Sequence, residues 1–382
     1  MLEPLALEGL LILDFSRAVA GPFCAMLLGD RGARVIKIED PKGGDESRGW
    51  GPVYLEGEST YFLGLNRNKE SLALDLKAAE SRPVVEALIA RADVLIENFR
   101  PEAAARLGLS YAQTSAVNPR IIHASISGFG SAGPEANRPG YDLIVQAMSG
   151  LMYANRQEDG TPHRVAFPVT DIVTGLFANQ AILLALLQKD RPRGRHLEVG
   201  LLDCLQASMC SLGPMYFGSG EEPPIGSAIV PYHTFLCADG RVVIGAPNER
   251  IWKRFAKAVG RERWLKDARF ASNKDRCANK QAVLAEIQEA VVHMTRAEIL
   301  ELLDREEVPC GPIHTVAEAY GSARAAVGSY EHPTAGTVKV SPNPIKGLVE
   351  RTPMGPAPLL GEHTARILEE LGYSGLGERT PE

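Results

Sequence analysis

The stretch that decides the fold is Leu-Leu-Ile-Leu-Asp-Phe at residues 10–15, followed by Arg-Val-Ile-Lys-Ile-Glu at residues 34–39. Each run has the length and apolar character of a buried strand, and the segment 21–31 between them has the pattern of a helix. Two parallel strands need a crossover of about this length, usually a helix. These residues therefore predict one βαβ unit at the start of the chain.

The alternation of strand and helix continues to about residue 200. A second βαβ unit is predicted from a strand at 71–76, a helix at 79–91 and a strand at 93–99. Alternation of this kind predicts an α/β fold with a mostly parallel sheet and helices on both of its faces. Further strands are expected at 120–127 and 196–201, with helices near 142–149 and 171–188.

The composition changes near residues 217–225, where Gly, Ser and Pro accumulate as in a linker. Beyond it, short strands at 232–237 and 242–244 and a capping box at Thr295 and Glu298 predict a smaller α+β unit. A last helix, at 364–371, is expected to return to the first domain. We therefore expect a large domain over 1–200 that is completed by 345–382, a linker at 201–226, a small domain at 227–325 and a return linker at 326–344.

The overall composition restricts the function. The chain has 382 residues, 45% of them apolar, and a net charge of −6, which argues against nucleic acid or a membrane surface as partner. Its six cysteines have no metal-ligand or disulfide spacing, so no metal site is expected. Strand-like sequence by Leu10 leaves no room for a signal peptide. These features predict a soluble, cytoplasmic protein that holds any polyanionic ligand by local cations.

Asp171 is the only charged residue between Arg164 and Lys189. A carboxylate in an otherwise apolar segment loses hydration free energy unless something stabilises it. Asp171 is expected where a strand ends and a helix begins, so it can be the helix N-cap. It can also be a carboxylate nucleophile that forms acyl-enzyme anhydrides. The two roles are compatible, and position alone does not separate them.

The segment Gly-Phe-Gly-Ser-Ala-Gly at 128–133 matches the dinucleotide-binding pattern directly after a predicted strand. Pro134 follows at once, so the third glycine does not open a helix whose N-terminus could bind a pyrophosphate. We therefore interpret the segment as a glycine-rich loop at the carboxyl edge of the sheet, where ligands of α/β proteins bind.

Short motifs run along the whole chain in a consistent order and spacing. They include Leu-Asp-Phe-Ser-Arg-Ala-Val-Ala-Gly-Pro at 13–22, Gly-Ala-Arg-Val-Ile-Lys-Ile-Glu at 32–39, Asn-Arg-Asn-Lys-Glu-Ser-Leu-Ala-Leu-Asp-Leu-Lys at 66–77, Ile-Glu-Asn-Phe-Arg-Pro at 96–101, Gly-Tyr-Asp at 140–142, Val-Pro-Tyr at 230–232 and Pro-Leu-Leu-Gly-Glu-His-Thr at 358–364. Together they resemble the class III coenzyme A transferases, the family of formyl-CoA transferase and the 2-methylacyl-CoA racemases.

The resemblance implies a large Rossmann-like domain, a small domain, long linkers and a dimer of two interlocked rings. It implies that Asp171 is the catalytic aspartate and that acyl-CoA is a substrate, with no permanently bound cofactor. The residues that it implies for CoA binding are Arg17, Ala18, Leu74, Lys77, Asn98, Phe99, Arg100, Arg106, Arg138 and Tyr141. Taken singly, most of these cations would be solvated surface residues, and Tyr141 a core tyrosine.

The branch that the motifs resemble most moves CoA between dicarboxylates such as succinate and glutarate. A well-placed carboxylate can attack a thioester and give an aspartyl anhydride and free CoA thiolate. Such a site needs walls that exclude water and N–H donors for the developing oxyanion, for which the loop 245–247 is a candidate. Arg138, His163 and His233 are the candidates for a distal carboxylate of the substrate.

Other functions remain open at the level of sequence. A racemase needs an acid and a base beside the thioester carbonyl, and in that branch a histidine precedes the aspartate at 142 and a glutamate follows the loop 245–247. This chain has Tyr141 and Asn248 there, although a slip of one residue would place Glu249. A dehydrogenase or a noncatalytic CoA-binding protein would keep the sheet without needing Asp171.

Overall fold

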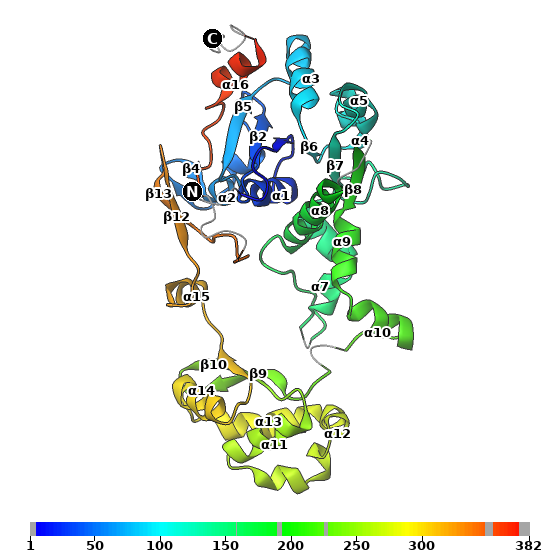
Figure 1. Cartoon of the computed structure of the whole chain (residues 1–382). Helices are drawn as coiled ribbons and strands as arrows, with labels where there is room; N and C mark the ends of the chain where they lie inside the picture. The colour runs from blue at the N-terminus through cyan, green and yellow to red at the C-terminus, as the bar shows by residue number, and fades with distance from the viewer. Residues whose placement is uncertain (1–4, 158, 189–192, 225–227, 348–353, 374–382) are drawn as a thin grey trace. The chain divides into compact units, whose positions relative to one another are not determined.

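The computed structural model describes residues 5–157, 159–188, 193–224, 228–347 and 354–373. The chain divides into two compact units (Figure 1). Unit 1 comprises Met1–Tyr153, Pro162–Gly220 and Ala326–Glu382, and unit 2 comprises Ala154–Thr161 and Glu221–Ala325.

Unit 1 is built on a six-stranded sheet in which every described pairing is parallel. The predicted α/β fold with a parallel sheet is therefore confirmed. The strands lie in the order β5 (Lys69–Ala73), β2 (Arg34–Glu39), β1 (Leu11–Asp14), β6 (Val94–Glu97), β7 (Ile122–Ser127) and β8 (Arg195–Gly200). The order reverses between β1 and β6, so the loops after these two strands open into the crevice where α/β proteins bind ligands.

Successive strand residues are divided between the two faces of the sheet. In β1, Ile12 belongs to one core cluster and Leu13 to the other, as expected for a period of two. The cluster of Ile12 contains residues of α1 (Ala20–Gly29), α8 (Val169–Leu187) and α9 (Leu201–Ser208). The cluster of Leu13 contains residues of α3 (Arg82–Arg91) and α16 (Thr364–Leu371). Both faces are thus covered by helices, which explains why the central strands β1 and β6 are almost continuously apolar.

Several connections differ from the expectation. The stretch 201–226, expected as a linker, contains α9, whose Leu201 and Leu205 are buried in the core of unit 1, and α10 (Leu212–Ser219). The expected return linker at 326–344 contains a hairpin of β12 (Gly328–His332) and β13 (Gly336–Val340), whose Tyr330 packs on α2 (Thr60–Leu65). The remaining helices of unit 1 are α4 (Pro101–Arg106), α5 (Tyr111–Val117) and α6 (Asp142–Met148), and α7 (Leu151–Ala154) ends at the unit boundary.

The C-terminal helix α16 belongs to unit 1 and contacts β5 and α3 (Figure 1). Its first residue, Thr364, accepts a hydrogen bond of 3.0 Å from the backbone N–H of Ala73. β5 itself begins at Lys69, two residues before the predicted start. Lys69 is fully buried, and its Nζ forms an ion pair with Asp14 Oδ2 at 2.9 Å. The sequence pattern places a charged side chain at the surface, whereas Lys69 lies in the core.

Unit 2 packs its helices against a small antiparallel sheet. The sheet has the order β11 (Cys310–Pro312), β10 (Gly240–Gly245) and β9 (Tyr232–Cys237). Trp252 and Trp264 lie stacked in its core, 5.6 Å apart between ring centroids. The capping box at Thr295 and Glu298 forms as predicted. The helices are α11 (Glu249–Ala258), α12 (Asn273–Ala278), α13 (Lys280–Val291), α14 (Arg296–Arg305) and α15 (Val316–Gly321).

Candidate active site

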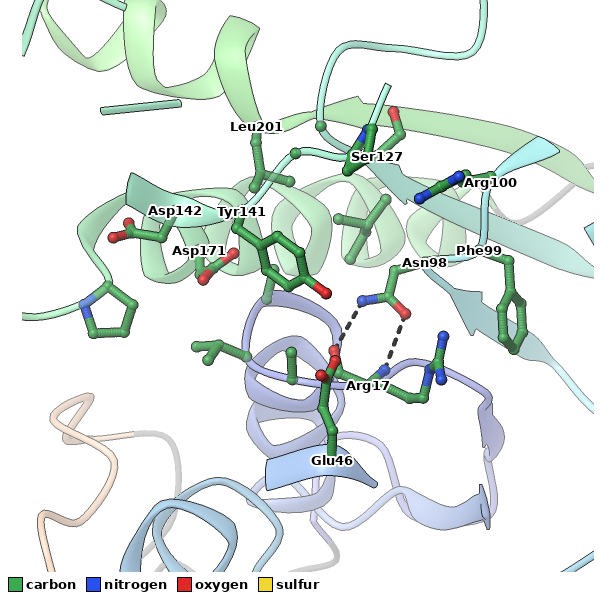
Figure 2. A pocket seen from close by; sticks show the side chains of 18 of the residues that line it. Arg17, Glu46, Asn98, Phe99, Arg100, Ser127, Tyr141, Asp142, Asp171 and Leu201 are labelled. Carbon is green, nitrogen blue, oxygen red and sulfur yellow. Dashed lines mark hydrogen bonds between the residues drawn. The ribbon is translucent and has the colours of Figure 1, made fainter. Parts of the chain in front are cut away.

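A cavity of about 580 Å³ opens in unit 1 at the carboxyl edge of the sheet (Figure 2). Its walls come from the turn after β1, the loop after β6, the loop after β7 and the first turns of α6 and α8. These segments lie far apart in the sequence and meet here because parallel strands end on the same edge. The cavity includes most of the residues that the sequence singled out: Arg17, Ala18, Asn98, Phe99, Arg100, Arg106, Arg138, Tyr141 and Asp171.

Asp171 occupies the first turn of α8 and is not its N-cap. The helix begins at Val169, the N-cap position is Pro168, and the described residues between α7 and α8 form no strand. Another residue supplies the missing acceptor: Asp142 Oδ1 accepts the backbone N–H of Thr170 at 2.9 Å. The N-cap interpretation of Asp171 is therefore wrong. Because Asp142 has taken this role, the carboxylate of Asp171 stays available to the cavity.

The electrostatics of Asp171 are unusual for an aspartate. Burial and, second, the negative charge of Asp142 raise the pKa of Asp171 to about 7. Among the residues that the structure describes, no donor forms a hydrogen bond with its carboxylate. Asp142 itself is held by Thr170 and by Gln146 Nε2, at 2.7 Å. A partly buried carboxylate with this pKa and no partner is a candidate reactive group.

Close packing at a glycine brings Asp171 to the cavity. Gly175 lies one helical turn after Asp171, where α8 meets α1. A Cβ atom at Gly175 would lie 2.7 Å from the carbonyl oxygen of Ala20, so only glycine allows this approach. The first turn of α8 is thereby placed beside residues 17–20. On the opposite wall, Gly128 and Gly140 touch each other in the same way and place Tyr141 against the end of β7.

The cations of the cavity differ in their pairing. Arg138 forms an ion pair with Glu135. Within the described part of the chain, Arg17, Arg100 and Arg106 have no carboxylate partner, and all three are exposed. They give the cavity a local positive charge in a protein whose net charge is −6. This is the arrangement expected of a site for a polyanion such as a diphosphate.

The turn that carries Arg17 is tied to the loop after β6. The backbone N–H of Arg17 donates to Asn98 Oδ1 at 3.0 Å, and Asn98 Nδ2 donates to the Arg17 carbonyl at 2.8 Å (Figure 2). The Arg17 guanidinium lies 5.6 Å from the ring centre of Phe99. Arg17 and Asn98 are 81 residues apart in the sequence. Their hydrogen bonds therefore join two distant loops into one wall of the cavity.

Leu74 and Lys77 do not line this cavity. They follow β5, the edge strand, which β2 separates from β1. Lys77 is exposed, and Leu74 packs against the core cluster of α3 and α16. The sequence analysis missed Glu46, Trp50 and Tyr61, which do line the cavity. Glu46 and Trp50 belong to the short segments after β2, and Tyr61 to the six-residue helix α2. These elements are too short for a periodic pattern to give a signal.

The remaining sequence candidates lie elsewhere. His163 is exposed in unit 1 and does not line the cavity. His233 belongs to β9 of unit 2, where its Nδ1 accepts the N–H of Tyr232. Asn248 caps α11 by accepting the N–H of Ile251 at 3.0 Å. Glu249 forms an ion pair with the fully buried Arg276, at 2.9 Å.

The carboxyl edge of the parallel sheet holds a cavity that is lined by arginines and contains an unpaired carboxylate. These features are typical of enzymes that act on anionic substrates. The particular family follows from comparison with known proteins. The model of CoA-transferase family III matches residues 7–364, so the chain belongs to this family and is a CoA transferase.

The relatives agree with this assignment. The chain is 37% identical over 375 residues to the succinyl-CoA:glutarate CoA-transferase of Mus musculus, covering 96% of this chain and 86% of the relative. It is 37% identical over 371 residues to the acetyl-CoA:oxalate CoA-transferase of Acetobacter aceti, covering 95% of each. A CAIB/BAIF family protein from Brucella suis has a similar structure, with a TM-score of 0.85 at 34% identity over 97% of this chain and 100% of that chain.

Proposed function

We propose that this enzyme transfers coenzyme A from a dicarboxylyl-CoA, such as succinyl-CoA, to a carboxylic acid acceptor, with Asp171 as nucleophile. The observation that carries the proposal is an Asp171 carboxylate that faces the cavity without a hydrogen-bond partner among the described residues. Relatives named for succinyl-CoA, glutarate and oxalate support small carboxylates as substrates. No bound cofactor is needed, because acyl-CoA is itself a substrate.

The first half of the reaction charges the aspartate. The Asp171 carboxylate attacks the thioester carbonyl, the C–S bond breaks, and an acyl-aspartyl anhydride and CoA thiolate form. The thiolate then attacks the aspartyl carbonyl, which yields an aspartyl-CoA thioester and releases the donor as its carboxylate. Both intermediates hydrolyse in water, so the apolar surroundings of Asp171 protect the thioester bond energy.

The second half reverses these steps with the acceptor. An oxygen of the acceptor carboxylate attacks the aspartyl-CoA thioester and displaces the thiolate. The thiolate attacks the acceptor's carbonyl, so the acceptor leaves as its CoA thioester and the attacking oxygen stays on Asp171. Isotope labelling can follow that oxygen.

The test is turnover with succinyl-CoA and glutarate whose carboxylates carry ¹⁸O. We expect the peptide that contains Asp171 to gain one ¹⁸O atom in a single turnover, which mass spectrometry detects. Asp171→Ala should lower kcat by at least ~10³, the scale of other lost nucleophiles, with unchanged circular dichroism. Active wild-type enzyme without label on Asp171, or more than a tenth of the activity in the variant, would refute the mechanism.

The alternative function is that of a 2-methylacyl-CoA racemase, which needs a free acid and base. Tyr141 occupies the position of the racemase histidine. Asn248 is used as a helix cap. Glu249 accepts hydrogen bonds from Arg276 and from the backbone N–H of Asn273, and these hold the pKa of Glu249 below its usual range. Both candidate groups thus have structural roles in unit 2. This favours transfer over racemisation.

CoA phosphates are the ligands that best fit the arginines of the cavity. Arg17, Arg100 and Arg106 lack acidic partners in the described structure and line the same cavity as Asp171. Asn98 and Phe99 complete this wall, and Ala18 and Tyr141 border the path toward Asp171. For the distal carboxylate of the acyl group, Arg138 is the candidate that lines the cavity.

The proposed assembly is an interlocked homodimer. α8 is long and apolar enough to cross a membrane by length and composition, and Leu176, Leu184 and Leu187 on it are exposed, as is Phe217 of α10. A second copy of the chain that covers these side chains would remove the apolar surface from water. We further propose a cytoplasmic location, which agrees with six free cysteines.

A further inference from the structure

The turn Ser16–Ala18, which forms one wall of the cavity, has a strained backbone. Ala18 has φ of +68°, in the left-handed region that residues with a Cβ rarely adopt. Such a conformation is unfavourable for a residue with a Cβ and persists only when the surroundings impose it. The residues that impose it therefore contribute to the shape of the cavity.

Asp45 is one of these residues. Its Oδ1 accepts the backbone N–H of Ala18 at 3.1 Å and also the N–H and hydroxyl of Ser47. The Asp45 side chain is buried and does not line the cavity. Burial opposes its ionisation, but Lys37 and Ser47 outweigh this and hold its pKa at about 2. Asp45 thus presents a permanent charge to the Ala18 N–H.

Lys37 completes the arrangement from β2. Its Nζ lies 2.8 Å from Asp45 Oδ2 and donates a hydrogen bond of 2.8 Å to the carbonyl oxygen of Ser16. Lys37 is fully buried and also does not line the cavity. One ion pair therefore holds the turn on both sides of Arg17, through the Ser16 carbonyl and the Ala18 N–H.

We propose that Asp45 and Lys37 are positioning residues for acyl-CoA: their buried ion pair fixes the Ser16–Ala18 turn so that Arg17 faces the phosphates of CoA. The inference rests on the proposed function, because it takes CoA as the ligand of Arg17. Neither residue touches the substrate. Their contribution is to binding and not to the chemical step at Asp171.

The chain offers a matched control. Asp30 and Arg67 form a second buried ion pair of unit 1, with 2.7 Å between Asp30 Oδ2 and Arg67 Nη2. Neither residue lines the cavity or contacts the Ser16–Ala18 turn in the described structure. Replacing the aspartate by asparagine takes the nearest anion away from a buried cation in both pairs, which destabilises a protein. Lys37 keeps Asp14 Oδ2 at 3.9 Å. Only the Asp45 variant should also change substrate binding.

The experiment compares Asp45→Asn with Asp30→Asn. We expect Asp45→Asn to raise the KM for succinyl-CoA about tenfold with kcat within about twofold, the pattern of lost ground-state binding. Both variants should lower the Tm by a similar amount, but Asp30→Asn should leave the KM for succinyl-CoA within about twofold of the wild-type value. With a succinyl-pantetheine thioester, which lacks the phosphates and adenine of CoA, Asp45→Asn should have the same KM as the wild type.

If Asp45→Asn does not fold, the double variant Lys37→Met/Asp45→Asn replaces it, because this change leaves no uncompensated charge in the pair. It should show the same rise in KM. An unchanged KM for succinyl-CoA in a folded variant would overturn the inference, as would an equal rise with the truncated donor. A wild-type enzyme that transfers no CoA from any acyl-CoA would instead overturn the proposed function.

Discussion

The raised pKa of Asp171 predicts that this proposed nucleophile lowers the stability of the folded enzyme at neutral and alkaline pH. We consider Asp171→Asn, which keeps the shape of the side chain and removes its charge. The pKa rises from an ordinary 3.8 to about 7 in the folded state. Between these values the folded state binds more protons than the unfolded state, so the free energy of unfolding falls as pH rises, and above pH 7 the loss is complete.

The magnitude follows from the size of the shift. A displacement of about three pKa units corresponds to roughly 4 kcal/mol at 1.36 kcal/mol per unit. Linkage ties the size of this loss to the same shift, so with a pKa of about 7 the loss should approach this value by pH 8. The wild type and Asp171→Asn should therefore be close in stability near pH 4, and the variant should be more stable by about this amount at pH 8.

The assay is urea unfolding of both proteins at pH 5 and pH 8, at one fixed protein concentration because the stability of the proposed dimer would depend on concentration. The exposed Asp75→Asn corrects for the general loss of one negative charge. The expected result is an advantage of Asp171→Asn that grows from pH 5 to pH 8. An advantage that is equal at both pH values, or a less stable variant at pH 8, would refute this account of the electrostatics.

Four further predictions concern catalysis and assembly. The kcat/KM should rise with pH through about 7, because Asp171 must be ionised to attack, and Asp142→Asn should move this rise to lower pH; a flat profile from pH 5 to 8 would contradict the assignment. Arg17→Ala and Arg106→Ala should each raise the KM for acyl-CoA, with a loss on the order of 1.5–3 kcal/mol for a charge-assisted contact, and an unchanged KM in both would place the phosphates elsewhere. Gly175→Ala should lower both Tm and kcat, since its Cβ would lie 2.7 Å from the Ala20 carbonyl; wild-type values of both would show that α8 tolerates the displacement. Differently tagged dimers should not exchange subunits under native conditions if the rings interlock, and exchange within hours, detected by affinity capture, would exclude that topology.

Local sequence was sufficient where periodicity and residue type decide the structure. The apolar runs of β1, β2 and β7 predicted strands of a parallel sheet. Runs of this kind occur because helices cover both faces of each strand. The capping box at Thr295 and the helix Thr364–Leu371 also formed as predicted. A single charge in a long apolar segment was enough to select Asp171 as a candidate. These inferences depend on neighbours within a few residues in the chain.

The sequence could not give the contacts that join distant segments. Asp142 caps α8 through a hydrogen bond to a residue 28 positions away in the sequence. For this reason Asp171 does not have to act as the cap. A pattern of residue types assigns charged side chains to the surface. Ion pairs between different strands and loops nevertheless bury Asp45, Lys37 and Lys69. The cavity itself exists because parallel strands end on one edge of the sheet and bring Arg17, Tyr141 and Asp171 together. The sequence therefore determined most strands and helices of the parallel sheet and the candidate reactive group Asp171. The tertiary structure decided the surroundings of Asp171, because burial and charge pairing depend on residues far apart in the chain.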